Sequence, residues 1–125
     1  MSSVLIKKVE TRTELKEFIE FHYDLYKGNA YDVPNLYSDE LNTLRKDRNA
    51  AFDFCEAEYF LAYKDGKIVG RVAAIINNLA NEKWNQKSVR FGWIDFIDDR
   101  EVSAALMKAV EDYGRSKGMT DMVGP

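Results

Sequence analysis

The chain has 125 residues, of which 46% are hydrophobic and 31% charged, so it can bury the core of one globular domain and is not disordered. Eighteen basic residues face 21 acidic ones, and the net charge of −3 argues against binding to nucleic acid or to an anionic membrane. One cysteine, Cys55, and one histidine, His22, exclude a disulfide framework and a cysteine-based zinc site, and we expect no metal. No segment resembles a membrane span or a signal peptide, so we expect a cytoplasmic protein.

The N-terminal third predicts one strand and two helices. The strand is SVLIKKVE, and Thr11 then begins a helix as its N-cap, with Glu14 completing a capping box. That helix should cover residues 13–27, because apolar side chains and His22 share one stripe of helical spacing. A second helix is expected over residues 38–48, on the surface or as a lid, because few of its residues are apolar.

The middle of the chain predicts a β-hairpin. Two apolar runs flank the sequence KDGK, and Asp65-Gly66 is a preferred centre for a type I′ turn, in which both residues need positive φ. Gly70 indicates a bulge or a close backbone approach in the second strand. That strand is almost entirely apolar over residues 72–76, which predicts a central strand with helices on both faces.

The C-terminal part predicts a parallel β-α-β unit. After a polar connector over residues 77–87, in which Trp84 should pack on the domain, a strand runs to residue 97. A strongly periodic helix follows over residues 100–117, with Asp98 as its expected cap, and residues 119–123 form a last strand. The predicted order is β-α-α-β-β-β-α-β, an α/β domain with a mixed sheet of about five strands.

Two stretches carry a resemblance to a known family. The hairpin sequence DGKIVGRVAA and the helix sequence ALMKAVEDYGRSKGM resemble those of GNAT-type N-acetyltransferases. The resemblance implies a GNAT-like α/β fold in which residues 1–125 form one domain. In that family another helix and two more strands follow, so this chain corresponds to a fold truncated at its C-terminus. We therefore expect it to be the N-terminal part of a larger protein.

The same resemblance implies an acetyl-CoA site with an altered phosphate loop. In the family, a loop of the form Arg/Gln-x-x-Gly-x-Gly/Ala holds the pyrophosphate at the start of the helix, and the preceding strand pairs with the pantetheine arm. Asp98, Glu101 and Ser103 occupy the three loop positions here. Carboxylates at a helix N-terminus stabilise the helix and repel a pyrophosphate, so acetyl-CoA or another acyl-CoA should bind weakly or not at all. The implied cofactor positions are Ile94, Phe96, Ile97, Arg100 and Ser103.

Two functions remain open from the sequence. The first is an acyl-CoA-dependent N-acyltransferase relative with a degenerate cofactor loop and an unknown substrate. Asp95 is its only named candidate for a general base, although an outward-facing strand carboxylate is the simpler interpretation. The second is a non-catalytic GNAT-like binding or structural module without activity of its own. In either case the C-terminal strand, as an exposed edge, predicts self-association or pairing with a missing C-terminal part of the same protein.

Overall fold

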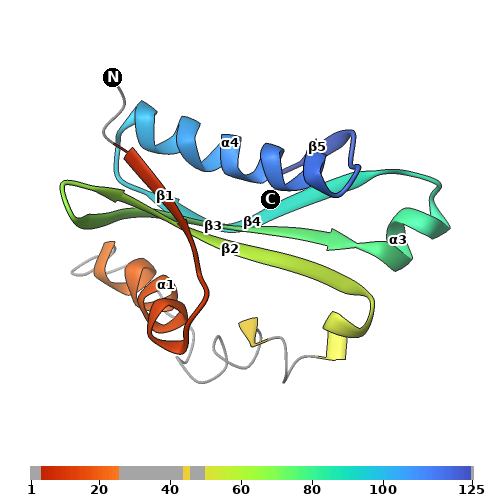
Figure 1. Cartoon of the computed structure of the whole chain (residues 1–125), viewed down its shortest axis with the longest axis horizontal. Helices are drawn as coiled ribbons and strands as arrows, with labels where there is room; N and C mark the ends of the chain where they lie inside the picture. Colours follow the sequence, from red (N-terminus) through yellow and green to blue (C-terminus); the bar gives the residue numbers. More distant parts are fainter. Residues whose placement is uncertain (1–3, 26–43, 46–49, 125) are drawn as a thin grey trace.

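Five strands form one mixed sheet in the order β1-β2-β3-β4-β5 (Figure 1). The structure is a computed structural model that describes residues 4–25, 44–45 and 50–124. Neighbouring strands pair antiparallel from β1 to β4, and β4 pairs parallel with β5, as the predicted β-α-β unit requires. The elements in chain order are β1 (Val4–Lys8), α1 (Arg12–Leu25), the 3₁₀ turn η1 (Ala50–Asp53), β2 (Cys55–Lys64), β3 (Lys67–Asn77), α3 (Asn78–Lys83), β4 (Ser88–Phe96), α4 (Arg100–Ser116) and β5 (Asp121–Val123).

The predicted capping box begins α1. The Glu14 N–H donates to Thr11 Oγ1 at 3.1 Å, and the Thr11 N–H donates to Glu14 Oε1 at 3.1 Å. Lys7 Nζ lies 2.8 Å from Glu14 Oε2. The Lys7 ammonium and the Glu10 N–H that donates to this carboxylate lower the pKa of Glu14 to about 2. The start of α1 is therefore tied to the end of β1 by one buried carboxylate.

Helices α1 and α4 cover opposite faces of the sheet (Figure 1). On one face α4 packs on an apolar cluster that we call the α4-side core, and on the other α1 packs on a second cluster, the α1-side core. The α4-side core contains Phe60, Ala62, Val69, Val72, Ala74, Ile76, Val89, Val102, Leu106 and Val110. The α1-side core contains Phe18, Ile19, Leu44, Ala57, Tyr59, Leu61 and Ala73. Strand β3 contributes to both, which confirms the central strand predicted from its apolar sequence.

The hairpin and the glycine beside it also form as predicted. Asp65 and Gly66 both have positive φ, 53° and 78°. Gly70 pairs with Ala62 next to a register shift between β2 and β3. A Cβ at Gly70 would lie 2.9 Å from both Leu106 Cδ1 and Val102 Cγ1, so the missing side chain lets α4 lie close to β3.

The connector before β4 differs from the prediction. It contains the short helix α3, because the Asn77 side chain accepts a hydrogen bond from the Ala80 N–H at 2.9 Å and caps it. Trp84 does not pack on the domain and is 67% exposed. The helix expected over residues 38–48 lies outside the described residues apart from residues 44–45, as does the side chain of His22. None of the described helices is long and apolar enough to cross a membrane.

The first prediction concerns the close contact at Gly70. Gly70→Ala should lower the free energy of unfolding by about 1–3 kcal/mol, because the new methyl group must displace Val102, Leu106 or Phe96. Gly92→Ala is the matched control, since a Cβ there meets no atom within 4 Å. Urea unfolding of both variants measures the difference. Equal stability of the two variants would contradict the close approach of α4 to β3.

The second prediction concerns the far edge of the sheet. All three residues of β5 are exposed, including Met122 and Val123. We propose that this edge pairs with a second copy of the chain, so Met122→Lys with Val123→Lys should shift the protein toward monomer. Leu5→Lys on the opposite edge strand is the control, because Leu5 is also exposed. Light scattering at high micromolar concentration measures the oligomeric state of each variant, and a monomeric wild-type chain would refute the proposal.

Candidate functional site

Strand β4 has one free edge over most of its length. Its pairing with β5 involves only residues 88–90, whereas its pairing with β3 extends to Phe96. Within the described part of the chain, residues 91–96 therefore have a strand on one side only. An extended ligand can hydrogen-bond to such an edge as an additional strand would.

A bulge interrupts β4 beside this edge. Arg71 pairs with Asp95 but Ala73 pairs with Gly92, so two residues of β4, Trp93 and Ile94, face one residue of β3. Trp93 has φ of 52°, which is uncommon for a residue with a large side chain. The bulge turns the Trp93 ring toward the α1-side core, while Phe91 and Ile94 pack against the α4-side core.

The backbone groups of β4 divide between its two edges. The Ile97 N–H donates to the Val69 carbonyl on β3 at 3.0 Å. Because backbone groups alternate along a strand, the N–H and C=O groups of Phe96 and Ile94 face the free edge. The Ile97 carbonyl accepts from the Asp99 N–H at 2.7 Å, so both backbone groups of Ile97 already have partners. Of the three strand positions expected at a cofactor, Ile94 and Phe96 thus present free-edge backbone.

The N-terminus of α4 lies at the end of the same strand, and its own carboxylate caps it. The cap is Asp99 and not Asp98 as the sequence analysis expected, because Asp99 is the residue with extended backbone directly before Arg100. Asp99 Oδ1 accepts from the Glu101 N–H at 2.9 Å, and its carbonyl accepts from the N–H groups of Val102 and Ser103. A phosphate at this helix end would need the N–H groups of Glu101 and Val102, and both already donate to Asp99.

Lys64 supplies a cation that the sequence analysis did not identify. Its Nζ lies 2.7 Å from Asp99 Oδ2, which joins the end of the β2–β3 hairpin to the start of α4. The hydrogen bond from Lys64 and that from the Glu101 N–H lower the pKa of Asp99 below its ordinary value. Lys64 is far from this junction in sequence, so no local motif indicates it.

The two remaining expected positions lie on the first turn of α4. Arg100 is exposed, and its carbonyl accepts a hydrogen bond from Ser103 Oγ at 3.1 Å. Glu101 is exposed beside them. The structure therefore brings Ile94, Phe96, Arg100 and Ser103 to one end of β4 and α4, together with three carboxylates.

Asp95, the candidate base, is engaged by a buried arginine. Its side chain is 11% exposed and does not point outward, which corrects the simpler interpretation of it as a surface carboxylate. Arg71 Nε donates to Asp95 Oδ2 at 2.9 Å, and Arg71 Nη2 lies 2.8 Å from the same oxygen. A carboxylate that accepts two bonds from a guanidinium is poorly placed to accept a substrate proton.

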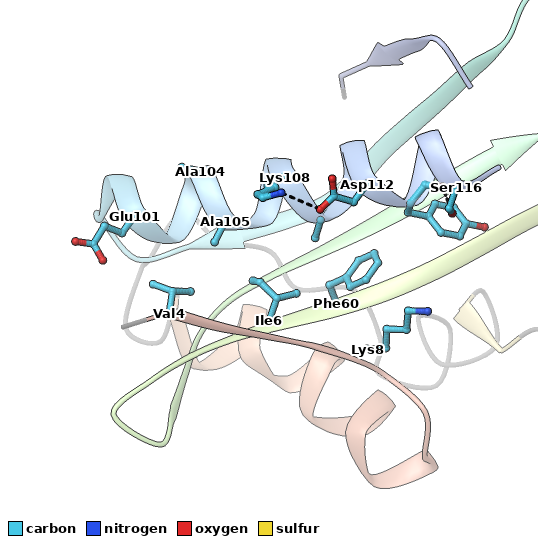
Figure 2. Close-up of a pocket in the computed structure, with 12 residues that line it drawn as sticks. Val4, Ile6, Lys8, Phe60, Glu101, Ala104, Ala105, Lys108, Asp112 and Ser116 are labelled. Atoms are coloured by element: carbon cyan, nitrogen blue, oxygen red, sulfur yellow. Dashed lines mark hydrogen bonds and ion pairs between the residues drawn. The ribbon is translucent and has the colours of Figure 1, made fainter. Parts of the chain in front are cut away.

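A cavity lies on the other flank of α4 (Figure 2). It is a groove of about 820 Å³ between α4 and the edge strand β1. Its floor is apolar, with Val4 and Ile6 from β1 and Phe60 from β2, and Lys108 and Asp112 pair on its rim at 3.2 Å. No residue of β4 lines it, so this groove is separate from the free edge of β4.

The fold of the chain matches many solved acetyltransferase structures. A tandem GNAT protein from the clavulanic acid biosynthesis pathway has a TM-score of 0.75 at 12% identity, over 97% of this chain and 36% of that one. An aminoglycoside acetyltransferase from an uncultured soil metagenomic sample has a TM-score of 0.67 at 14% identity, over 98% of this chain and 77% of that one. This chain has the GNAT fold. Glucosamine-6-phosphate N-acetyltransferase from Arabidopsis thaliana shares it, with a TM-score of 0.64 at 15% identity over 99% of this chain and 82% of that one.

Two curated proteins are similar in sequence, and no protein-family model matches the chain. Protein YghO of Escherichia coli strain K12 is 35% identical over 121 residues, which are 97% of this chain. Bacterial ceramide synthase of Caulobacter vibrioides is 34% identical over 118 residues, which are 94% of this chain. The chain spans 31% of the length of each of these two relatives.

The third prediction concerns the pH dependence of the Asp99 cap. Because the pKa of Asp99 is lowered by folding, the charged carboxylate stabilises the fold above its ordinary pKa of 3.8, and this contribution disappears as the pH falls through the lowered value. Asp99→Asn keeps a capping side chain and removes the charge, so it should be less stable than wild type at neutral pH only. Urea unfolding between about pH 2 and pH 7 measures the difference.

Asp98→Asn is the control for this prediction. This variant removes the carboxylate of the exposed residue that directly precedes Asp99. It should leave the stability nearly unchanged at every pH. A larger effect of Asp98→Asn than of Asp99→Asn would show that the wrong aspartate has been identified as the cap.

Proposed function

We propose that this chain is part of an acyl-CoA-dependent N-acyltransferase with a degenerate cofactor loop. The observation that carries the proposal is the free edge of β4 beside the N-terminus of α4, on a GNAT fold. The backbone of Ile94 and Phe96 would hold the pantetheine arm. An amine would attack the thioester carbonyl, so that a C–N bond forms, the C–S bond breaks, and the cofactor leaves as the free thiol with the proton that the amine loses. A relative named bacterial ceramide synthase supports this class, because a ceramide is itself an N-acyl amide.

The nucleotide end of the cofactor does not fit the residues present. The Glu101 N–H already donates a hydrogen bond to Asp99 Oδ1, and the Lys64 ammonium is already paired with Asp99 Oδ2. Each further carboxylate within a few ångströms of a pyrophosphate lowers its affinity on the order of fivefold at a solvated surface. Arg100 offers one cation against Asp98, Asp99 and Glu101. We therefore propose weak or no acetyl-CoA binding by this chain alone.

A second function, a non-catalytic GNAT-like module, is favoured by one observation. The carboxylate of Asp95, the only candidate base named from the sequence, is committed to Arg71. A domain that keeps the fold, but whose described residues offer no free carboxylate at Asp95 and no open phosphate cradle at the start of α4, would serve in binding or in packing against other parts of a protein.

The fourth prediction separates the nucleotide end of the site from the pantetheine end. Calorimetric titration of the wild-type chain with acetyl-CoA should show no saturation below about 1 mM, whereas Asp99→Asn with Glu101→Gln should bind at least about tenfold more tightly. The double variant frees Lys64 and removes two charges that repel phosphate. Acetyl-pantetheine, which lacks the nucleotide, should bind wild type and variant equally.

Arg100→Ala is the control for the sign of the local charge. Micromolar binding of acetyl-CoA by wild type that weakens in Arg100→Ala would show that one arginine outweighs its acidic neighbours. If neither ligand binds any variant, the transferase proposal fails and the module remains.

A further inference from the structure

Arg71 is a buried cation in the middle of the central strand. Its side chain is 3% exposed, although arginine is almost never fully buried without partners. Besides the two contacts to Asp95, its Nη1 donates to the Phe18 carbonyl of α1 at 2.9 Å. Its guanidinium carbon lies 5.1 Å from the centre of the Phe18 ring and 5.8 Å from that of Trp93.

These contacts reach a residue in the bulge of β4 and the residue directly after it. Asp95 follows the bulge, Trp93 is the bulged residue with positive φ, and the guanidinium touches both. A strained backbone of this kind persists only where the surrounding structure holds it. Arg71 Nη1 is held by the Phe18 carbonyl of α1. If β4 returned to a regular register, Asp95 and Trp93 would move, and the guanidinium could not move with them without losing this hydrogen bond.

The buried pair is not needed merely to fill the core. Replacing both members of a buried ion pair by apolar side chains of similar volume is often neutral or stabilising, whereas a planar guanidinium fixes the direction of the groups it binds. What the pair supplies here is geometry. It holds the side chain of Asp95 directly after the bulge, and its guanidinium lies over the Trp93 ring within the bulge.

We propose that Arg71 is a positioning residue that holds the Trp93 bulge and so presents the backbone of Ile94 and Phe96 to an acyl-pantetheine ligand. The first half of this proposal, that Arg71 holds the Trp93 bulge, concerns the conformation of β4 alone. The second half, that the bulge presents backbone groups to an acyl-pantetheine, rests on the proposed function. Asp95 acts with Arg71 as its anchor and is not a base.

The fifth prediction tests the first half without any ligand. Trp84→Phe leaves Trp93 as the single tryptophan, because the chain contains two. In that background Arg71→Met with Asp95→Leu should remain folded by far-UV circular dichroism. Quenching of Trp93 fluorescence by acrylamide should increase, and the amide at position 95 should exchange its proton at least about tenfold faster, while the amides of Leu106 and Val110 in α4 should not change.

The control removes another ion pair from the same background. Lys7→Met with Glu14→Gln breaks the pair at the start of α1, whose carboxylate is also buried, and should leave Trp93 and β4 unchanged. Unchanged quenching and exchange in the Arg71→Met, Asp95→Leu protein would overturn the proposal. So would equal changes in the control, because the pair would then act through general stability.

Titration with acetyl-pantetheine tests the second half. Loss of the bulge together with at least about tenfold weaker binding supports the positioning role, and loss of the bulge with unchanged binding overturns it. If the wild-type chain does not bind acetyl-pantetheine, the proposed function fails at the β4 edge and the second half fails with it. The fluorescence and exchange results still decide whether Arg71 holds the bulge.

Discussion

Strand β3 is buried on both faces, and the other elements are arranged around it. Its residues from Val69 to Ala74 are all buried, with Val72 and Ala74 under α4 and Ala73 under α1. Each face can be covered only if a helix lies close to the strand, and Gly70 provides the room for α4. The position of strand β4 depends on β3, because β3 is its only partner strand over residues 91–96 within the described chain.

Local signals in the sequence predicted most of this fold. The capping box at Thr11, the Asp65-Gly66 turn and the apolar stripe of α4 each depend on residues close together in the chain, and the structure contains all three. The short helix α3 was missed because six residues, most of them polar, are too few to show a helical period. The cap of α4 was placed one residue early, since Asp98 and Asp99 are equivalent by composition and only the backbone distinguishes them.

The site was less predictable because its contacts join distant parts of the chain. Arg71 and Asp95 are 24 residues apart, and Lys64 and Asp99 are 35 residues apart. Neither spacing has a periodic signature, so a buried arginine in an apolar strand gives no sign of its partner. The resemblance to the GNAT family directed attention to the end of β4 and the start of α4, but it could not show that Asp95 faces a guanidinium or that Lys64 partners the cap.

The Lys64–Asp99 contact has a mechanical consequence. It fastens the tip region of the hairpin to the N-cap of α4, while the missing side chain of Gly70 lets Val102 and Leu106 in the first two turns lie close to β3. A displacement of the hairpin tip would therefore be transmitted directly to the start of the helix. Loss of the ion pair alone would leave α4 on the sheet, because Val102, Leu106 and Val110 remain buried in the α4-side core.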